Sequence, residues 1–201
     1  MANIKNIIFD FGGVLVDWNP EYLYRKEFDD ETEMNHFLEN ICNSEWNIRQ
    51  DEGRPLSEAT ALLQKEYPEH KEMIGHYYGR WEEMLGGVIE ESERVLKMLK
   101  PHYPVYGLTN WSAETITIAY DRYDFFQLLD GIVVSGDEKL IKPDPKLYTV
   151  LLERYDLKAE ESLFIDDNLK NIETAREMGF QTIHYTERVD LEKEVKSMGL
   201  I

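Results

Sequence analysis

Short apolar runs that end in polar residues are the main regularity of this chain. The first, residues 4–9, reads as a buried strand. From residue 88 onward, similar runs alternate with longer segments in which apolar residues have helical spacing. Alternation of this kind predicts parallel strands joined by crossover helices, which is an α/β, Rossmann-like fold. We expect strands at 4–9, 105–108, 132–134, 162–165 and 182–184, and helices at 90–99, 112–120, 145–154, 169–178 and 191–198.

Between residues 17 and 87 the strand pattern is missing and apolar positions take helical spacing. Pro55 marks a break before one of the helices, and Gly86-Gly87 is expected to close the segment as a flexible joint. We therefore predict a Rossmann-like parallel-sheet core made of residues 1–16 and 88–201, with a helical cap, residues 17–87, inserted into it. The helices expected in the cap are 20–28, 30–41, 56–67 and 70–85.

Composition narrows the range of partners and compartments. The 201 residues include 40 acidic and 22 basic side chains, a formal charge of −18, so nucleic acid and anionic membrane surfaces are not expected partners. Cys42 is the only cysteine, which excludes an intrachain disulfide and suggests a small core residue. No signal segment or run of roughly 20 apolar residues is found, so we expect a cytoplasmic protein.

The most informative polar residue is Asp10, which directly follows the first expected strand. Gly12 and Gly13 come next and allow the backbone to turn sharply. In an open parallel sheet, ligands bind at the carboxyl ends of the strands, where a carboxylate can act as a nucleophile or a metal ligand. Taken alone, Asp10 could equally end the strand and cap a turn.

Two later segments place further polar groups after expected strands. Thr109-Asn110 follows one of them, and its hydroxyl and amide could donate to a phosphoryl oxygen, although such a pair also commonly caps a helix. Lys142 precedes Pro143-Asp144-Pro145, which stiffens the turn. A lysine fixed in this way can neutralise an anionic nucleophile and a transferring phosphoryl group; its simpler interpretation is a solvated loop residue.

Paired acids, Asp166-Asp167, follow the strand expected at 162–165. Adjacent carboxylates repel each other and usually need a cation or several hydrogen-bond donors. Mg²⁺ suits this site because it prefers oxygen ligands. Asn171 would lie one turn into the next helix and could reach back to the acids. The alternative is an acidic loop in which Asp167 or Asn168 caps that helix.

As an ordered set, these segments resemble the motifs of the haloacid dehalogenase superfamily. The resemblance covers nearly the whole chain, because that family also carries a helical cap after its first motif. It implies a Mg²⁺-dependent phosphatase that hydrolyses small phosphate monoesters, of the sugar-phosphate type, through an aspartyl-phosphate. The expected partner is therefore a small phosphorylated metabolite. The matching segments are Asp10-Phe11-Gly12-Gly13-Val14, Thr109-Asn110, Lys142-Pro143 and Asp166-Asp167.

The same resemblance implies roles for individual residues. Asp10 would attack phosphorus, while Thr109 and Lys142 hold the transferred group. Mg²⁺ would be bound by the Asp10 carboxylate, the Gly12 carbonyl and Asp167, with Asp166 either ligating the ion or orienting a water on it. The residues expected to bind substrate are Thr109, Asn110, Lys142, Gly13 and Trp18.

Gly12 departs from the commonest phosphatase pattern of the superfamily. Most members carry a second Asp two residues after the nucleophile, which protonates the leaving alcohol, and such a group typically contributes about 10² to 10⁴ in rate. Without it, turnover would be slow, favour good leaving groups, or use an acid from the cap. Glycine here, with Val14 and Asp17 following, resembles a branch related to bacterial glucose-1-phosphate phosphatases.

Two other functions compete with the phosphatase. A 2-haloacid dehalogenase uses the same nucleophile without a second Asp and without metal, but members of that group typically have Ser-Asn where this chain has Asp166-Asp167. It would also need a cationic clamp for the substrate carboxylate, for which Arg25 and Arg49 are only guesses. The other alternative is a phosphate-binding or regulatory protein with little turnover. Specificity is expected from the cap, whose aromatic residues should be mostly core, with Trp18 and Trp111 nearest the motifs.

Overall fold

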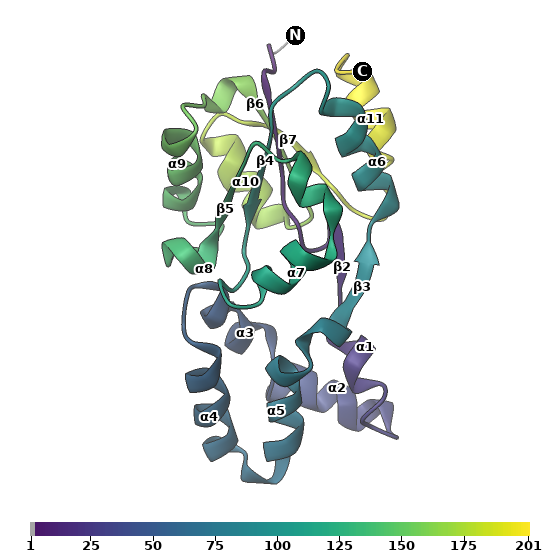
Figure 1. The fold of residues 1–201 in the computed structure, drawn as a ribbon, viewed down its shortest axis with the longest axis vertical. Helices are drawn as coiled ribbons and strands as arrows, with labels where there is room; N and C mark the ends of the chain where they lie inside the picture. The colour runs from purple at the N-terminus through teal and green to yellow at the C-terminus, as the bar shows by residue number, and fades with distance from the viewer. Residues whose placement is uncertain (1–2) are drawn as a thin grey trace.

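Five parallel strands form the central sheet in the computed structural model, which describes residues 3–201 (Figure 1). Their order across the sheet is β5-β4-β1-β6-β7, so β1 is the middle strand, between β4 and β6. Every neighbouring pair is parallel, which confirms the predicted α/β class. The strands are β1 (Asn6–Phe9), β4 (Val105–Thr109), β5 (Gly131–Val134), β6 (Ser162–Asp166) and β7 (Gln181–His184).

Helices cover both faces of this sheet because successive side chains of a strand point to opposite faces. Ile7 and Phe9 share one buried cluster with residues of α6, α7 and α11, whereas Ile8 belongs to the cluster formed with α9 and α10. All three side chains are fully buried. The helices are α6 (Glu90–Leu99), α7 (Ile116–Arg122), α8 (Ser135–Glu138), α9 (Pro145–Arg154), α10 (Leu169–Glu177) and α11 (Leu191–Ser197), with 3₁₀ turns at Asp124–Leu128 and Ala159–Glu161.

A second group of helices lies below the sheet in Figure 1. In the sequence it is inserted between two short strands, β2 (Val16–Trp18) and β3 (Leu85–Val88). Tyr24, Phe37 and Tyr77 are buried there, and the predicted burial of Cys42 is confirmed. Within residues 3–201, no helix is both long and apolar enough to cross a bilayer. The helices are α1 (Glu21–Tyr24), α2 (Glu31–Asn40), α3 (Ser44–Asp51), α4 (Leu56–Glu66) and α5 (Lys71–Gly79), with 3₁₀ turns at Pro68–His70 and Trp81–Met84.

The two glycines expected to close the segment as a joint, Gly86-Gly87, lie in a β-ribbon. β3 contains both glycines and pairs antiparallel with β2, which the sequence did not predict. A Cβ on Gly86 would lie 2.2 Å from Asp17 Oδ2, so the glycine leaves space for the Asp17 side chain of the neighbouring strand.

Several helix boundaries also differ from those predicted. The helix α3 was missed, and the segment expected as one helix, residues 70–85, is divided at Arg80 into α5 and a 3₁₀ turn. The helix expected from residue 112 begins at Ile116, because the Ser112 hydroxyl accepts the Glu114 N–H at 3.2 Å in a preceding turn.

Candidate active site

The order of the strands brings three predicted site residues to one edge of the sheet. Asp10 directly follows β1, and its backbone N–H donates to the Ile165 carbonyl oxygen at 2.9 Å. Thr109 and Asp166 end the two strands on either side, β4 and β6. One carboxylate oxygen each from Asp10, Asp166 and Asp167 lie within 4.8 Å of one another. These three acids are called the carboxylate cluster below.

Lys142 lies among these acids and is not a solvated loop residue. Its Nζ is 2.9 Å from Asp10 Oδ1, 2.7 Å from Asp166 Oδ2 and 2.9 Å from the Leu108 carbonyl oxygen. The side chain has no exposed surface. All three ammonium hydrogens therefore have acceptors, two of them in the carboxylate cluster.

Asn110 holds the backbone of this lysine. Its Nδ2 donates to the Lys142 carbonyl oxygen at 2.9 Å, and its Oδ1 accepts the Lys142 N–H at 2.7 Å. We expected the Asn110 amide to bind substrate, but the structure turns both of its polar atoms toward the lysine loop. Asn110 thus positions the ammonium group from a residue far away in the sequence.

The two adjacent acids have different surroundings. Asp166 is fully buried and accepts from Asn171 Nδ2 at 3.0 and 3.1 Å, from the Asn168 N–H at 2.8 Å and from Lys142. The expectation that Asn171 reaches back to the acids is confirmed. Asp167, in contrast, is exposed. Of the pair, Asp167 therefore has the carboxylate more available to a ligand from solution.

The charges in this cluster favour a bound cation. The pKa of Asp10 is raised to about 7, mainly by burial. The charge of Lys142 lowers this pKa, and the charges of Asp166 and Asp167 raise it. Burial alone would lower the pKa of Lys142, but Asp10 and Asp166 raise it above its usual value. Although Asp167 is exposed, partial desolvation of its carboxylate among the neighbouring groups, together with the charge of Asp166, also raises its pKa. Three carboxylates around a single ammonium group leave excess negative charge, and an all-oxygen donor set fits Mg²⁺.

Thr109 carries a hydroxyl that lacks a partner. Its Oγ1 is buried and makes no hydrogen bond to any of residues 3–201. Leaving a buried polar group unpaired costs about 1–3 kcal/mol, which a ligand oxygen could recover by bonding to it. The Thr109 hydroxyl, at the end of β4, is thus suited to receive an anionic group bound at the carboxylate cluster.

Gly13 adopts a left-handed backbone conformation, whereas Gly12 does not. Its φ is +73°, and an added Cβ would lie 2.3 Å from Asp167 Oδ2. Gly13 is one of the residues expected to bind substrate, and its N–H donates to the Val16 carbonyl oxygen at 3.0 Å. Gly13 therefore allows the chain to turn and leaves space for the Asp167 carboxylate.

We expect Gly13→Ala to weaken Mg²⁺ binding by about 10- to 100-fold, because the new methyl group displaces Asp167. The measurement is a calorimetric Mg²⁺ titration of the metal-stripped protein. Gly199→Ala is the matched control, since Gly199 has φ +72° and no atom within 4 Å of an added Cβ. Both variants lose roughly 1–2 kcal/mol of stability through left-handed backbone strain. Equal Mg²⁺ affinity in the two variants would contradict this role of Gly13.

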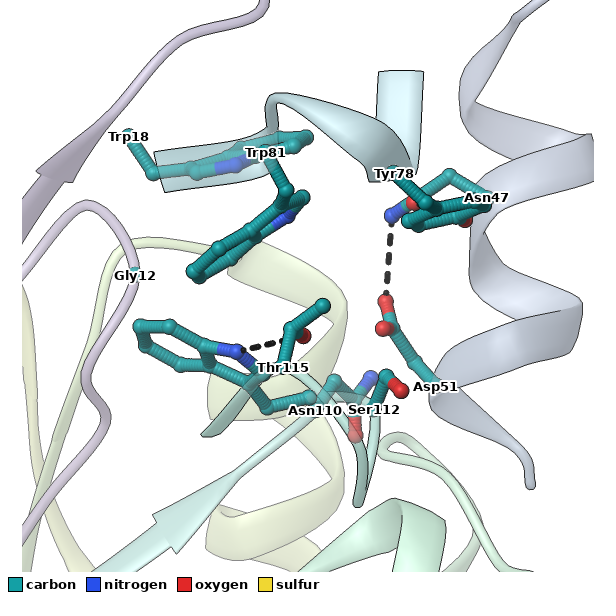
Figure 2. Close-up of a pocket in the computed structure, with 10 residues that line it drawn as sticks. Gly12, Trp18, Asn47, Asp51, Tyr78, Trp81, Asn110, Ser112 and Thr115 are labelled. Carbon is teal, nitrogen blue, oxygen red and sulfur yellow. Dashed lines mark hydrogen bonds between the residues drawn. The ribbon is translucent and has the colours of Figure 1, made fainter. Parts of the chain in front are cut away.

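A cavity of about 80 Å³ lies beside Gly12, between the sheet and the helical segment (Figure 2). Trp18, an expected substrate-binding residue, lines it, and the Trp18 indole N–H is buried without a partner among residues 3–201. Arg25 and Arg49, the guessed carboxylate clamp, are exposed and paired with glutamates instead. The residues lining the cavity are Gly12, Trp18, Asn47, Asp51, Tyr78, Trp81, Asn110, Trp111, Ser112 and Thr115.

Among the polar lining residues that sequence reasoning missed are Asn47 and Asp51. Both lie on α3, whose sequence is mostly polar and gave no helical signal. The sequence does not distinguish Asp51 from the many other acidic residues. Its place in the cavity lining becomes visible only in the structure.

Several known proteins are similar to this chain over most of its length. The family model for haloacid dehalogenase-like hydrolases matches residues 7–185. A sesquiterpene phosphatase from Aspergillus oryzae is 26% identical, over 98% of this chain and 97% of its own. A D-ribitol-5-phosphate phosphatase from Bacteroides thetaiotaomicron is 24% identical, over 96% and 97%. A HAD family enzyme from the same organism, crystallised with magnesium and inorganic phosphate, has a TM-score of 0.72 at 19% identity, over 95% and 98%.

Proposed function

The chain belongs to the haloacid dehalogenase-like hydrolase family, and on that premise we propose that it is a Mg²⁺-dependent phosphatase of small sugar-phosphate-type monoesters. The family and the phosphatase relatives support phosphatase activity. The observation that carries the proposal is the carboxylate cluster with Lys142 inside it and the unpaired Thr109 hydroxyl beside it.

Asp10 is the proposed nucleophile. Its Oδ1 accepts the Phe11 N–H at 2.7 Å and lies 2.9 Å from Lys142 Nζ, so the carboxylate is held in one orientation. A carboxylate oxygen of Asp10 forms a bond to phosphorus while the bond from phosphorus to the substrate oxygen breaks, which gives an aspartyl-phosphate. Lys142 and the Thr109 hydroxyl stabilise the charge on the transferred group. Water then releases phosphate from Asp10.

Mg²⁺ would be held by the Asp10 carboxylate, the Gly12 carbonyl oxygen and Asp167. When bound, it offsets the repulsion between anionic Asp10 and an anionic phosphate. Asp166 is committed to Lys142, Asn171 and a backbone N–H, so its proposed role is to fix the lysine and the start of α10. The cluster would thus divide its acids between binding the ion and holding the lysine.

The helical segment supplies the proposed specificity. We propose that residues 17–87 act as a cap, because Asn47, Tyr78 and Trp81 from this segment face Gly12 across the cavity. Aromatic faces stack on the apolar side of a sugar ring, and the Trp18 indole N–H, which has no partner among residues 3–201, suits one of its hydroxyl groups. This mixture supports a polyol or sugar leaving group.

The test is phosphate release from a panel of sugar phosphates and p-nitrophenyl phosphate by metal-stripped protein, with and without added Mg²⁺. We expect release only with Mg²⁺, and faster turnover of at least one sugar phosphate than of simple alkyl phosphates. Incubation with 2-chloropropionate is the parallel assay. Chloride release without metal would replace the phosphatase with a dehalogenase, and phosphate binding without turnover would favour a regulatory protein.

A further inference from the structure

Gly12, two residues after the proposed nucleophile Asp10, has no side chain. Gly12 borders the cavity, and a Cβ built on it meets nothing within 4 Å. Its φ lies outside the left-handed region. The first side-chain atom of a larger residue would therefore fit here, yet the sequence provides no acid at this position. A leaving alcohol bound in the cavity would need its proton from another direction.

Asp51 faces the same cavity from the helical segment. Figure 2 shows Asp51 and Gly12 on opposite sides, with Thr115 and the Trp81 ring between them in the view. Asn47 Nδ2 donates to Asp51 Oδ2 at 3.3 Å, a long hydrogen bond. The Asp51 backbone carbonyl oxygen accepts the Ser135 hydroxyl, which ties this end of α3 to the core. The carboxyl is thus anchored through its backbone and open to the cavity.

We propose that Asp51 is the general acid of this enzyme, supplying from the helical segment the proton that position 12 cannot supply. This inference rests on the proposed phosphatase function. In contrast to Glu52, which pairs with exposed Arg49, Asp51 has no ion-pair partner among residues 3–201. The cavity between it and Gly12 has room for a small leaving group.

Asp51 would give up a proton in the first half of the reaction and regain one in the second. As Asp10 bonds to phosphorus, the phosphorus–oxygen bond of the ester breaks and its electron pair goes to the leaving oxygen. That oxygen takes the proton of the Asp51 carboxyl and departs as the alcohol. In the second half, the Asp51 carboxylate accepts a proton from the water that attacks phosphorus, and the Asp10 carboxylate is released.

The surroundings of Asp51 keep the proton available near neutral pH. Burial raises its pKa to about 7, opposed by the Ser112 backbone N–H. Burial also raises the pKa of Tyr77 and that of Tyr78. The Arg54 guanidinium donates to the Gln50 side chain and to the Trp46 carbonyl oxygen. The titratable groups on neighbouring elements are Tyr77 and Tyr78 on α5, Arg54 after α3, Glu114 before α7 and Lys139 after α8.

The test compares Asp51→Asn with wild type on two substrates. We expect kcat/KM for an alkyl phosphate such as glycerol 2-phosphate to fall by about 10²-fold or more, because its alkoxide cannot leave unprotonated. p-Nitrophenyl phosphate needs no proton on its leaving group, so its rate should change only a few-fold. Wild-type kcat/KM for the alkyl phosphate should decline above pH about 7 as the carboxyl deprotonates, and this decline should vanish in the variant.

Two further variants separate catalysis from structure. Glu52→Gln, which changes the adjacent acid, should leave both rates unchanged. Gly12→Asp combined with Asp51→Asn should regain alkyl phosphate turnover, since a Cβ at position 12 meets no atom within 4 Å and the position borders the cavity. An equal loss on both substrates without recovery in the double variant, or no loss on either, would overturn the role of Asp51. A wild-type protein inactive on both substrates would instead refute the phosphatase proposal.

Discussion

Asp10→Asn is expected to lower kcat for phosphate release by about 10⁴- to 10⁶-fold, the range seen when a member of a covalent catalytic unit is removed. An amide lacks the negative charge needed to attack phosphorus. Its oxygen can still accept from the Phe11 N–H and from Lys142, so the site should keep its shape. The measurement is kcat at saturating substrate and Mg²⁺, with thermal unfolding followed by circular dichroism.

Asp190→Asn is the matched control for this change. Asp190 caps α11 by accepting the Lys193 N–H at 2.9 Å, and asparagine caps helices equally well. Its kcat should equal that of wild type. Acid-quenched wild-type protein should also carry a phosphoryl group on the peptide that contains Asp10. Full turnover in Asp10→Asn, or a phosphoryl group on another residue, would remove Asp10 from its role.

Lys142→Met should lower the free energy of unfolding by about 3–5 kcal/mol in EDTA and abolish turnover. Removing one partner of a buried ion pair leaves an uncompensated charge, and here it leaves two, on Asp10 and Asp166. Among residues 3–201, Lys142 is the only cationic side chain within 4.0 Å of these two carboxylates. Methionine has a similar length, so the loss reports the charge more than the packing. Urea denaturation gives the free energy.

The control for this variant is Lys146→Met, four residues further along the chain. Lys146 is exposed on α9, so its loss should change stability by no more than about 0.5 kcal/mol. If the two variants unfold at the same urea concentration, the buried ion pairs contribute little. In that case Lys142 would act only on the bound phosphate.

The site residues that lie at the ends of strands could be predicted from the sequence. Asp10, Thr109 and Asp166 each follow a short apolar run, and a parallel sheet brings the carboxyl ends of its strands to the same edge. The burial of Lys142 could not be predicted in this way. It depends on hydrogen bonds to Asn110, a pairing between distant parts of the chain that leaves no local pattern.

The helical segment was harder to predict for two physical reasons. In α3 only Trp46 and Ile48 are large apolar residues, so the helix lacks an amphipathic pattern and depends on Asn43 as its cap. The strands β2 and β3 have three and four residues, and two of those in β3 are glycines. Such short strands form because they pair with each other, not because their residues favour the extended state.

That pairing of β2 with β3 bears on how enzymes of this kind diversify. The chain leaves the core and returns to it through hydrogen-bonded neighbours, which in a sheet lie about 5 Å apart. An insertion whose ends meet so closely can be lengthened, shortened or replaced without stretching the core. Asp10, Lys142 and the acids of the cluster would stay in place during such an exchange. Evolution, or a designer making chimaeras, could thus change the substrate while keeping the phosphoryl-transfer chemistry.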